Sequence, residues 1–139
     1  SLIIVNSDNI VRFDYPRMMR EVKRRKADGA IVVFTDADPK WSFAKVGPDG
    51  YVTEVAEKNP ISDQATAGVY YWRKSTDFAW YADRMIAQNK RVRNEFYVCP
   101  VYNEAIADGK KIIVYRAEAF HSVGTPEDLE EYFLFRRGL

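Results

Sequence analysis

The chain has 139 residues, the length of one domain, and its 21 basic and 20 acidic residues leave a net charge of +1. This balance excludes a nucleic-acid-binding protein that relies on overall positive charge, and a hydrophobic content of 47% excludes a disordered chain. The apolar runs are too short to span a bilayer, so no membrane partner is expected. Cys99, the single cysteine, excludes a disulfide framework and indicates a reducing compartment, which we take to be the cytoplasm.

Strands and helices are predicted to alternate through most of the chain. In chain order we expect a strand at 2–5, a helix from Asp14 and Pro16 to the Asp28–Gly29 stop, strands at 30–34, 43–46, 51–55 and 67–72, helices at 76–89 and after Pro100, a strand at 111–115 and a helix from Thr125. Residues 47–50, Gly-Pro-Asp-Gly, predict the one hairpin. Buried strands joined by helices indicate an α/β domain with a mixed sheet flanked by helices.

Several elements carry a prediction about which side they bury, and in the helix after Pro100 the residues predicted to face inward are Val101, Tyr102, Ala105 and Ile106. The strand Leu2–Val5 is continuously apolar, which predicts that both of its faces are covered. The helix 76–89 places Phe78, Ala82, Met85 and Ile86 on one face, which predicts a buried stripe. In the last helix, the corresponding buried stripe is predicted to consist of Leu129, Tyr132 and Phe133.

Ligands of such sheets bind at the carboxyl ends of strands, so the residues there are the first candidates for a functional site. Asp8 follows the first apolar strand, and an isolated carboxylate of this kind suits Mg²⁺, which takes one or two carboxylates together with phosphate oxygens of a substrate. The alternative is a turn aspartate that binds its own backbone. Asp36 and Asp38 follow a second buried strand, where a solvated turn is the favoured interpretation and a metal site the other. We expect only one of these two places to hold a metal.

Other polar groups admit both a functional and a structural interpretation. Glu57 and Lys58 end a strand, where they could bind sugar hydroxyls and a phosphate, or form a surface charge pair. His121, the only histidine, is interpreted as structural or exposed. Six basic residues lie in the helix over 17–26, and we interpret them as a solvated surface that binds no nucleic acid.

Several short segments, in this order, together resemble the sugar-phosphate nucleotidylyltransferases, which make nucleoside-diphosphate sugars. They are Ile4–Asn9 (IVNSDN), Trp41–Val46 (WSFAKV), Val55–Lys58 (VAEK), Ala67–Trp72 (AGVYYW), Phe96–Asn103 (FYVCPVYN) and Gly124–Leu129 (GTPEDL). The resemblance implies a partial GT-A-like nucleotide-diphospho-sugar transferase fold. It implies a reaction between an NTP and a sugar 1-phosphate, for surface or capsular polysaccharide precursors.

The resemblance also implies roles for individual residues. Asp8 matches the aspartate that binds Mg²⁺, and Glu57 and Lys58 match the pair that contacts the sugar and its phosphate, with Lys58 and Asp8 as the catalytic groups. Ser42 stands where the family has a glycine facing the sugar, and the backbone at Gly68 matches the turn that lines the sugar pocket. Ser122 stands where many members have a second metal-binding aspartate, so it is a weak candidate ligand.

One family feature has no counterpart in the chain. The glycine-rich loop that binds the triphosphate precedes the central strand in the family, whereas no glycine occurs here before Gly29. We therefore expect residues 1–139 to form a single, truncated domain that is inactive alone and exposes a sheet edge, which favours a dimer. Two alternatives remain: a GT-A glycosyltransferase that uses Asp36 and Asp38 as a D-x-D metal site, and a degenerate, non-catalytic module.

Overall fold

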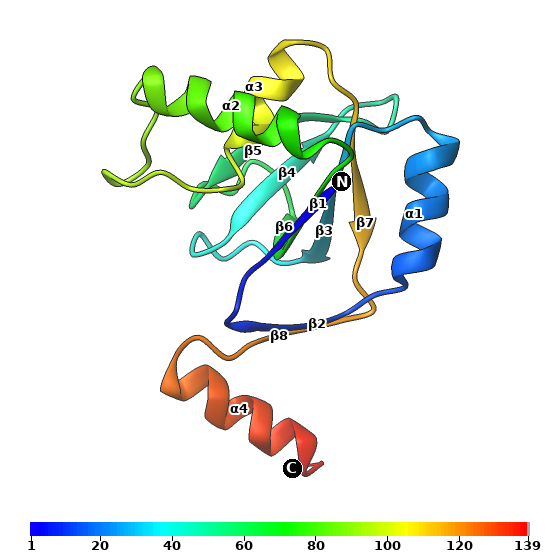
Figure 1. The fold of residues 1–139 in the computed structure, drawn as a ribbon. Coiled ribbons are helices and arrows are strands. Elements are labelled where there is room, and N and C mark those ends of the chain that lie inside the picture. The colour runs from blue at the N-terminus through cyan, green and yellow to red at the C-terminus, as the bar shows by residue number, and fades with distance from the viewer. Residues whose placement is uncertain (139) are drawn as a thin grey trace.

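A six-stranded mixed sheet lies at the centre of the computed structural model, which describes residues 1–138 (Figure 1). The strand order is β5 (Val52–Glu57), β4 (Ser42–Val46), β6 (Gln64–Trp72), β3 (Gly29–Thr35) and β7 (Ile112–Arg116). Strand β1 (Leu2–Val5) also pairs with β6, antiparallel, on the edge opposite β3. Because β3 and β7 are parallel and the other pairs antiparallel, the expected mixed α/β sheet is confirmed.

Helices cover both faces of this sheet. Helices α2 (Ser75–Ala87) and α3 (Val101–Ala107) pack on one face, where Trp72 and Tyr102 stack with their ring centroids 4.2 Å apart. Helix α1 (Tyr15–Arg24) packs on the other face through Met18 and Val22. Residues alternate between the two cores along the strands, as the pleat of a β-strand requires.

A small two-stranded ribbon lies beneath the sheet in Figure 1 and was not predicted from the sequence. It is formed by β2 (Asn9–Arg12) and β8 (Ala119–Ser122), which pair antiparallel with Asn9 opposite Ser122. Helix α4 (Pro126–Arg136) follows β8 directly. The ribbon therefore brings the chain just after β1 together with the chain just before α4.

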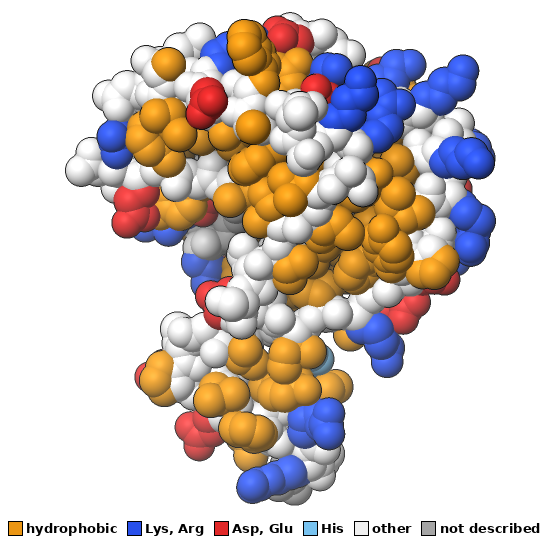
Figure 2. All heavy atoms as spheres, viewed as in Figure 1, with side chains coloured by type: hydrophobic (Ala, Val, Ile, Leu, Met, Phe, Trp, Pro, Cys, Tyr) orange, Lys and Arg blue, Asp and Glu red, His pale blue; other side chains and the backbone are white. Residues whose placement is uncertain are grey.

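The predicted buried side of α3 is confirmed, since Val101, Tyr102 and Ala105 are buried, whereas three other predictions about buried sides need correction. Strand β1 is covered on one face only, since Ile3 and Val5 are 38% and 59% exposed, and Figure 2 shows hydrophobic side chains gathered where Figure 1 places this strand. The expected stripe of α2 is interrupted because Ile86 is exposed, while Tyr81 takes a buried position instead. None of the described residues of α4 is buried, because this helix packs mainly against β8 and not against the sheet; Leu129 and Phe133 are exposed.

The local signals at turns and helix starts are confirmed. Strands β4 and β5 pair across the Gly-Pro-Asp-Gly turn, in which Gly50 has a φ of +82°. Asp14 accepts a hydrogen bond from the backbone N–H of Arg17 and Thr125 from that of Asp128, so both residues cap their helices as expected. In the described part of the chain, no helix is long and apolar enough to cross a membrane.

Candidate functional site

The turn between β1 and β2 presents Asp8 at the end of the sheet. The backbone N–H of Asn6 donates to the carbonyl of Gly68 at 2.8 Å, and the backbone N–H of Val123 donates to the carbonyl of Asp8, also at 2.8 Å. The turn is therefore fixed on one side by β6 and on the other by the end of β8. Its position makes Asp8, an exposed residue, part of the wall of a cavity.

This cavity, which we call the central cavity, has a volume of about 160 Å³. Its lining includes four residues singled out from the sequence: Asp8, Ser42, Glu57 and Ser122. They come from the β1–β2 turn, β4, β5 and β8, so the fold brings together side chains that are far apart in the chain. The other lining residues are Asn6, Asn9, Lys40, Trp41, Thr66 and Tyr70.

The surroundings of Glu57 in the central cavity change the pKa of its carboxyl group. It lies directly opposite Ser42 in the β4–β5 pair, and the Ser42 hydroxyl donates a hydrogen bond to Glu57 Oε2. Burial raises the pKa of Glu57, while the Ser42 hydrogen bond and the charges of Lys58 and Arg93 lower it; the pKa remains above its usual value. The carboxylate is thus held in place with one oxygen committed to the protein.

Lys58 and Gly68 lie beside the central cavity and not in its lining. The Lys58 ammonium is 4.9 Å from the ring centroid of Tyr97, and Tyr97 lines a second cavity of about 250 Å³ that shares Ser42 and Glu57 with the first. Gly68 lies inside β6 rather than in a turn, with a φ of +72°. Its role in the site is to leave room for the side chains of Asn6 and Asn9, which a Cβ at this position would meet at 2.6–2.8 Å.

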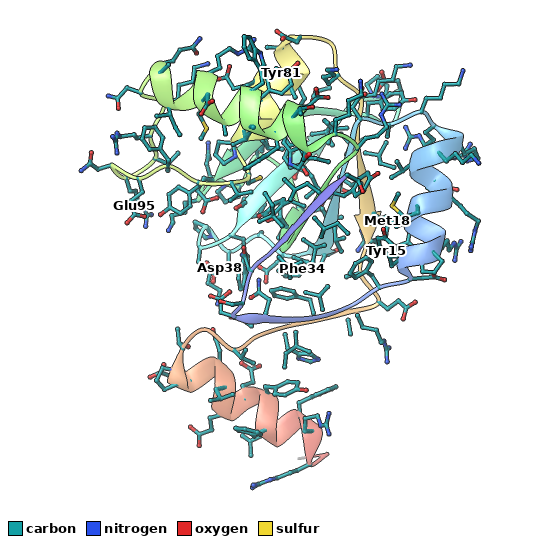
Figure 3. The ribbon with its side chains drawn as sticks, in the orientation of Figure 1. Tyr15, Met18, Phe34, Asp38, Tyr81 and Glu95 are labelled. Atoms are coloured by element: carbon teal, nitrogen blue, oxygen red, sulfur yellow. The ribbon has the colours of Figure 1, made fainter. Side chains whose placement is uncertain are left out.

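Asp36 and Asp38 form a turn, as the favoured interpretation held. The backbone N–H of Asp38 donates to Asp36 Oδ1 at 2.8 Å and lowers the pKa of Asp36, and the backbone N–H of Lys40 donates to Asp38 Oδ1 at 3.0 Å. Figure 3 shows Phe34 and Asp38 at the end of the sheet that faces the β2–β8 ribbon. Asp36, but not Asp38, lines a third cavity of about 300 Å³, which adjoins the central cavity at Trp41 and Ser122.

His121 lines this third cavity and has aromatic neighbours. Its ring centroid lies 5.2 Å from that of Tyr132 and 4.5 Å from that of Phe135, both on α4. The contacts show a side chain that packs β8 against α4, which agrees with the structural interpretation of this histidine.

Burial raises the pKa of the Cys99 thiol, which disfavours the reactive thiolate form.

The oxygen atoms of the central cavity fit a hard divalent cation. Asp8 supplies a carboxylate and Ser122 a hydroxyl, and both belong to the class of oxygen ligands that Mg²⁺ takes. Within residues 1–138 no three His, Cys, Asp or Glu side chains gather into a metal site. The donors present therefore fit Mg²⁺ held between the protein and a phosphate-bearing substrate, and do not form an all-protein cage.

Sequence reasoning assigned no role to several lining residues. Asn6 immediately follows β1, so the rule that pointed to Asp8 also points to Asn6. Thr66 and Tyr70 lie on β6, and their hydroxyls are 2.9 Å apart at the base of the cavity. No sequence signal singles them out, because a buried strand of this composition is indistinguishable from ordinary core.

Comparison with known proteins gives one family. A family model described as nucleotidyl transferase matches residues 1–137. A nucleoside-diphosphate-sugar pyrophosphorylase from Vibrio cholerae is similar in structure, with a TM-score of 0.78 and 26% sequence identity over 95% of this chain. A protein from Bacillus anthracis, provisionally named a glucose-1-phosphate thymidylyltransferase and crystallised with sucrose, has the same fold, with a TM-score of 0.72 and 19% identity over 99% of this chain.

The matches cover nearly all of this chain but only part of each solved structure. The chain spans 57% of the length of the first structure and 55% of the second. None of the curated proteins matches it.

Proposed function

The chain belongs to the nucleotidyl transferase family, and on that premise we propose that it forms the sugar-phosphate side of an enzyme that joins an NTP and a sugar 1-phosphate into a nucleoside-diphosphate sugar. The observation that supports this most directly is the shared cavity of Asp8 and Glu57. One carboxylate suits a metal–phosphate group, and the other suits sugar hydroxyls. A sugar 1-phosphate carries both groups within one molecule.

The roles that we propose follow from the position of each side chain. Glu57 accepts hydrogen bonds from sugar hydroxyls through the oxygen that Ser42 leaves free, and Ser42 holds it in place. Lys58, next to Glu57, draws the phosphate towards the site by its charge. Asp8, with Ser122, would hold Mg²⁺, which supplies positive charge against the phosphate oxygens. These residues bind and orient; the reaction needs little else from them, because positioning two anions in line is the main task.

We further propose that residues 1–139 alone do not catalyse the reaction. The central cavity contains groups for a sugar phosphate, whereas the chain has no glycine before Gly29 from which to form a loop that cradles a triphosphate. An active enzyme of this kind would supply cytoplasmic precursors for surface or capsular polysaccharides. A pyrophosphate-release assay tests the proposed inactivity, and robust NTP-dependent release by this chain would contradict it.

The binding experiment tests the site itself. Calorimetric titration with glucose 1-phosphate in the presence of Mg²⁺ should show weak binding, and glucose without the phosphate should bind more weakly still. Asp8→Asn should remove the Mg²⁺ dependence, and Glu57→Gln should weaken binding with or without Mg²⁺. Equal binding of glucose and glucose 1-phosphate, or no effect of either variant, would rule out this use of the cavity.

The glycosyltransferase alternative is less well supported. Asp36 and Asp38 each accept a backbone N–H of their own turn, so one oxygen of each carboxylate already has a protein donor. The family match also favours nucleotidyl transfer. Metal titration distinguishes the two sites, because Asp38→Ala should leave Mn²⁺ binding unchanged if Asp8 is the ligand.

A further inference from the structure

Ser122 connects the central cavity to helix α4. It is the last residue of β8, and it lines both the central cavity and the third cavity. Its hydroxyl donates a hydrogen bond to Asp128 Oδ2 at 2.8 Å, and Asp128 lies in the first turn of α4. The Ser122 hydroxyl proton is therefore engaged in a hydrogen bond to a carboxylate on α4.

This hydrogen bond decides what Ser122 can offer to the central cavity. A serine hydroxyl has one proton and two lone pairs, so a hydroxyl that donates to Asp128 can act towards other groups only through its lone pairs. Asp8 lies against the segment that follows Ser122, because its Oδ2 is 2.8 Å from the position that a Cβ on Gly124 would occupy. The central cavity is thus lined both by Asp8 and by a serine whose hydroxyl oxygen has lone pairs to offer.

No hydrogen bond from within the described part of α4 reaches the Asp128 side chain. The backbone N–H of Asp128 donates to Thr125 Oγ1 at 3.1 Å, which is one half of a capping box. In a full capping box the carboxylate would accept from the backbone N–H of the cap residue; among the described hydrogen bonds, the Asp128 side chain accepts from Ser122 instead. The Asp128 side chain therefore links α4 to β8 and does not complete the helix cap.

We propose that Asp128 is a positioning residue that turns Ser122 into a neutral oxygen ligand for a divalent cation held by Asp8. This inference rests on the proposed function, because it assumes that Asp8 binds the cation. Asp128 places a negative charge behind the Ser122 hydroxyl and fixes its orientation, as second-layer carboxylates do behind metal ligands. The same hydrogen bond ties α4 to the site, so cation binding should also hold α4 against β8.

Mn²⁺ binding to the whole chain tests this arrangement without relying on activity. Free Mn²⁺ is measured by electron paramagnetic resonance for the native chain and for four single variants. Asp128→Asn and Ser122→Ala should each weaken binding by about tenfold, the lower end of the effect of losing a hydrogen-bonded partner behind a metal ligand. Glu131→Gln is the matched control, because Glu131 is also on α4 and lines the third cavity but has no hydrogen bond to Ser122. Asp8→Asn should abolish binding.

A rescue experiment separates positioning from a structural effect. Ser122→Asp supplies a carboxylate directly, so adding Asp128→Asn to that variant should no longer weaken Mn²⁺ binding. If Asp128→Asn alters the helix content measured by circular dichroism, the Mn²⁺ affinity of Ser122→Ala provides the test instead, because this variant leaves the Thr125 cap intact. If Asp128→Asn and Glu131→Gln bind Mn²⁺ with equal affinity while Asp8→Asn does not bind it, the proposed role of Asp128 is wrong but the metal site at Asp8 stands. Unchanged binding by Asp8→Asn would overturn the metal site of the proposed function as well.

Discussion

Ser42 and Glu57 form a pair in which one side chain influences the pKa of the other. Burial raises the pKa of Glu57, and the hydrogen bond from Ser42 to the charged form opposes this effect. Ser42→Ala removes the opposing contribution, so the pKa of Glu57 should rise further. If ionised Glu57 binds the sugar, affinity for glucose 1-phosphate should fall as the pH drops through this pKa, and the midpoint should move to higher pH in the variant.

A pH series of calorimetric titrations measures this midpoint. Ser62→Ala is a suitable control, since the Ser62 hydroxyl donates to the carbonyl of Ala44 and not to a carboxylate. An unchanged midpoint in Ser42→Ala would show that Ser42 does not set the ionisation of Glu57.

Gly68 tests whether the backbone of β6 shapes the site. Gly68→Ala forces a Cβ against the amides of Asn6 and Asn9 at a φ of +72°, so it should lower the free energy of unfolding by about 2–3 kcal/mol and displace the turn that carries Asp8. Gly109 provides a control with a φ of +79° and no atom within 4 Å of the added Cβ. Gly109→Ala should cost only the backbone strain, about 1 kcal/mol. Chemical denaturation compares the two variants, and equal losses would mean that the contacts with Asn6 and Asn9 do not matter.

At the level of elements, an ion network around the buried carboxylate of Glu104 joins α2 to α3. Glu104 on α3 is 3% exposed and accepts hydrogen bonds from Arg84 on α2, at 2.8 Å, and from Lys90. Burial alone would raise the pKa of Glu104, but these two hydrogen bonds outweigh it and leave the pKa below its ordinary value of 4.5. The ionised carboxylate therefore stabilises the fold fully above that value, and this contribution is lost as the pH falls through the lowered pKa.

Glu104→Gln should reduce the free energy of unfolding by about 2 kcal/mol at neutral pH, the scale of a hydrogen bond to a charged group. The difference from the native chain should shrink as the pH falls below the lowered pKa, because native Glu104 is then protonated. Denaturation curves recorded from neutral to acidic pH measure this difference. Glu54→Gln, an exposed carboxylate on β5, should change little at any pH; a constant difference for Glu104→Gln would contradict the proposed role of ionisation.

Elements with a strong local signal could be predicted from the sequence, and those that depend on distant partners could not. The turn at 47–50 and the caps at Asp14 and Thr125 are decided by residues next to one another. Strands β2 and β8 are four residues each and exist because they pair across most of the chain length, which leaves no local pattern to detect. The same reason explains the site: Asp8 could be suggested from its strand, whereas Thr66 and Tyr70 join it only through β6.

At the scale of the whole molecule, β1 has one edge that pairs with no other strand among the described residues. Within the described residues β1 pairs with β6 alone, so its other edge has unpaired backbone groups, and Ile3 and Val5 are exposed on the face next to it. The strand carries no charged residue that would discourage pairing with another chain. We therefore predict that two copies associate through β1, which can pair with itself antiparallel across a two-fold axis.

Light scattering coupled to size-exclusion chromatography should show a mass that rises from monomer towards dimer with protein concentration. Val5→Lys places a charge on the exposed face of β1, so it should shift the mass to that of the monomer without lowering thermal stability, because Val5 is 59% exposed and little packing is lost. Ile86→Lys makes the same kind of change at an exposed apolar residue on α2 and should leave the association intact. If both variants behave like the native chain, or if the native chain is monomeric at every concentration, β1 does not mediate self-association.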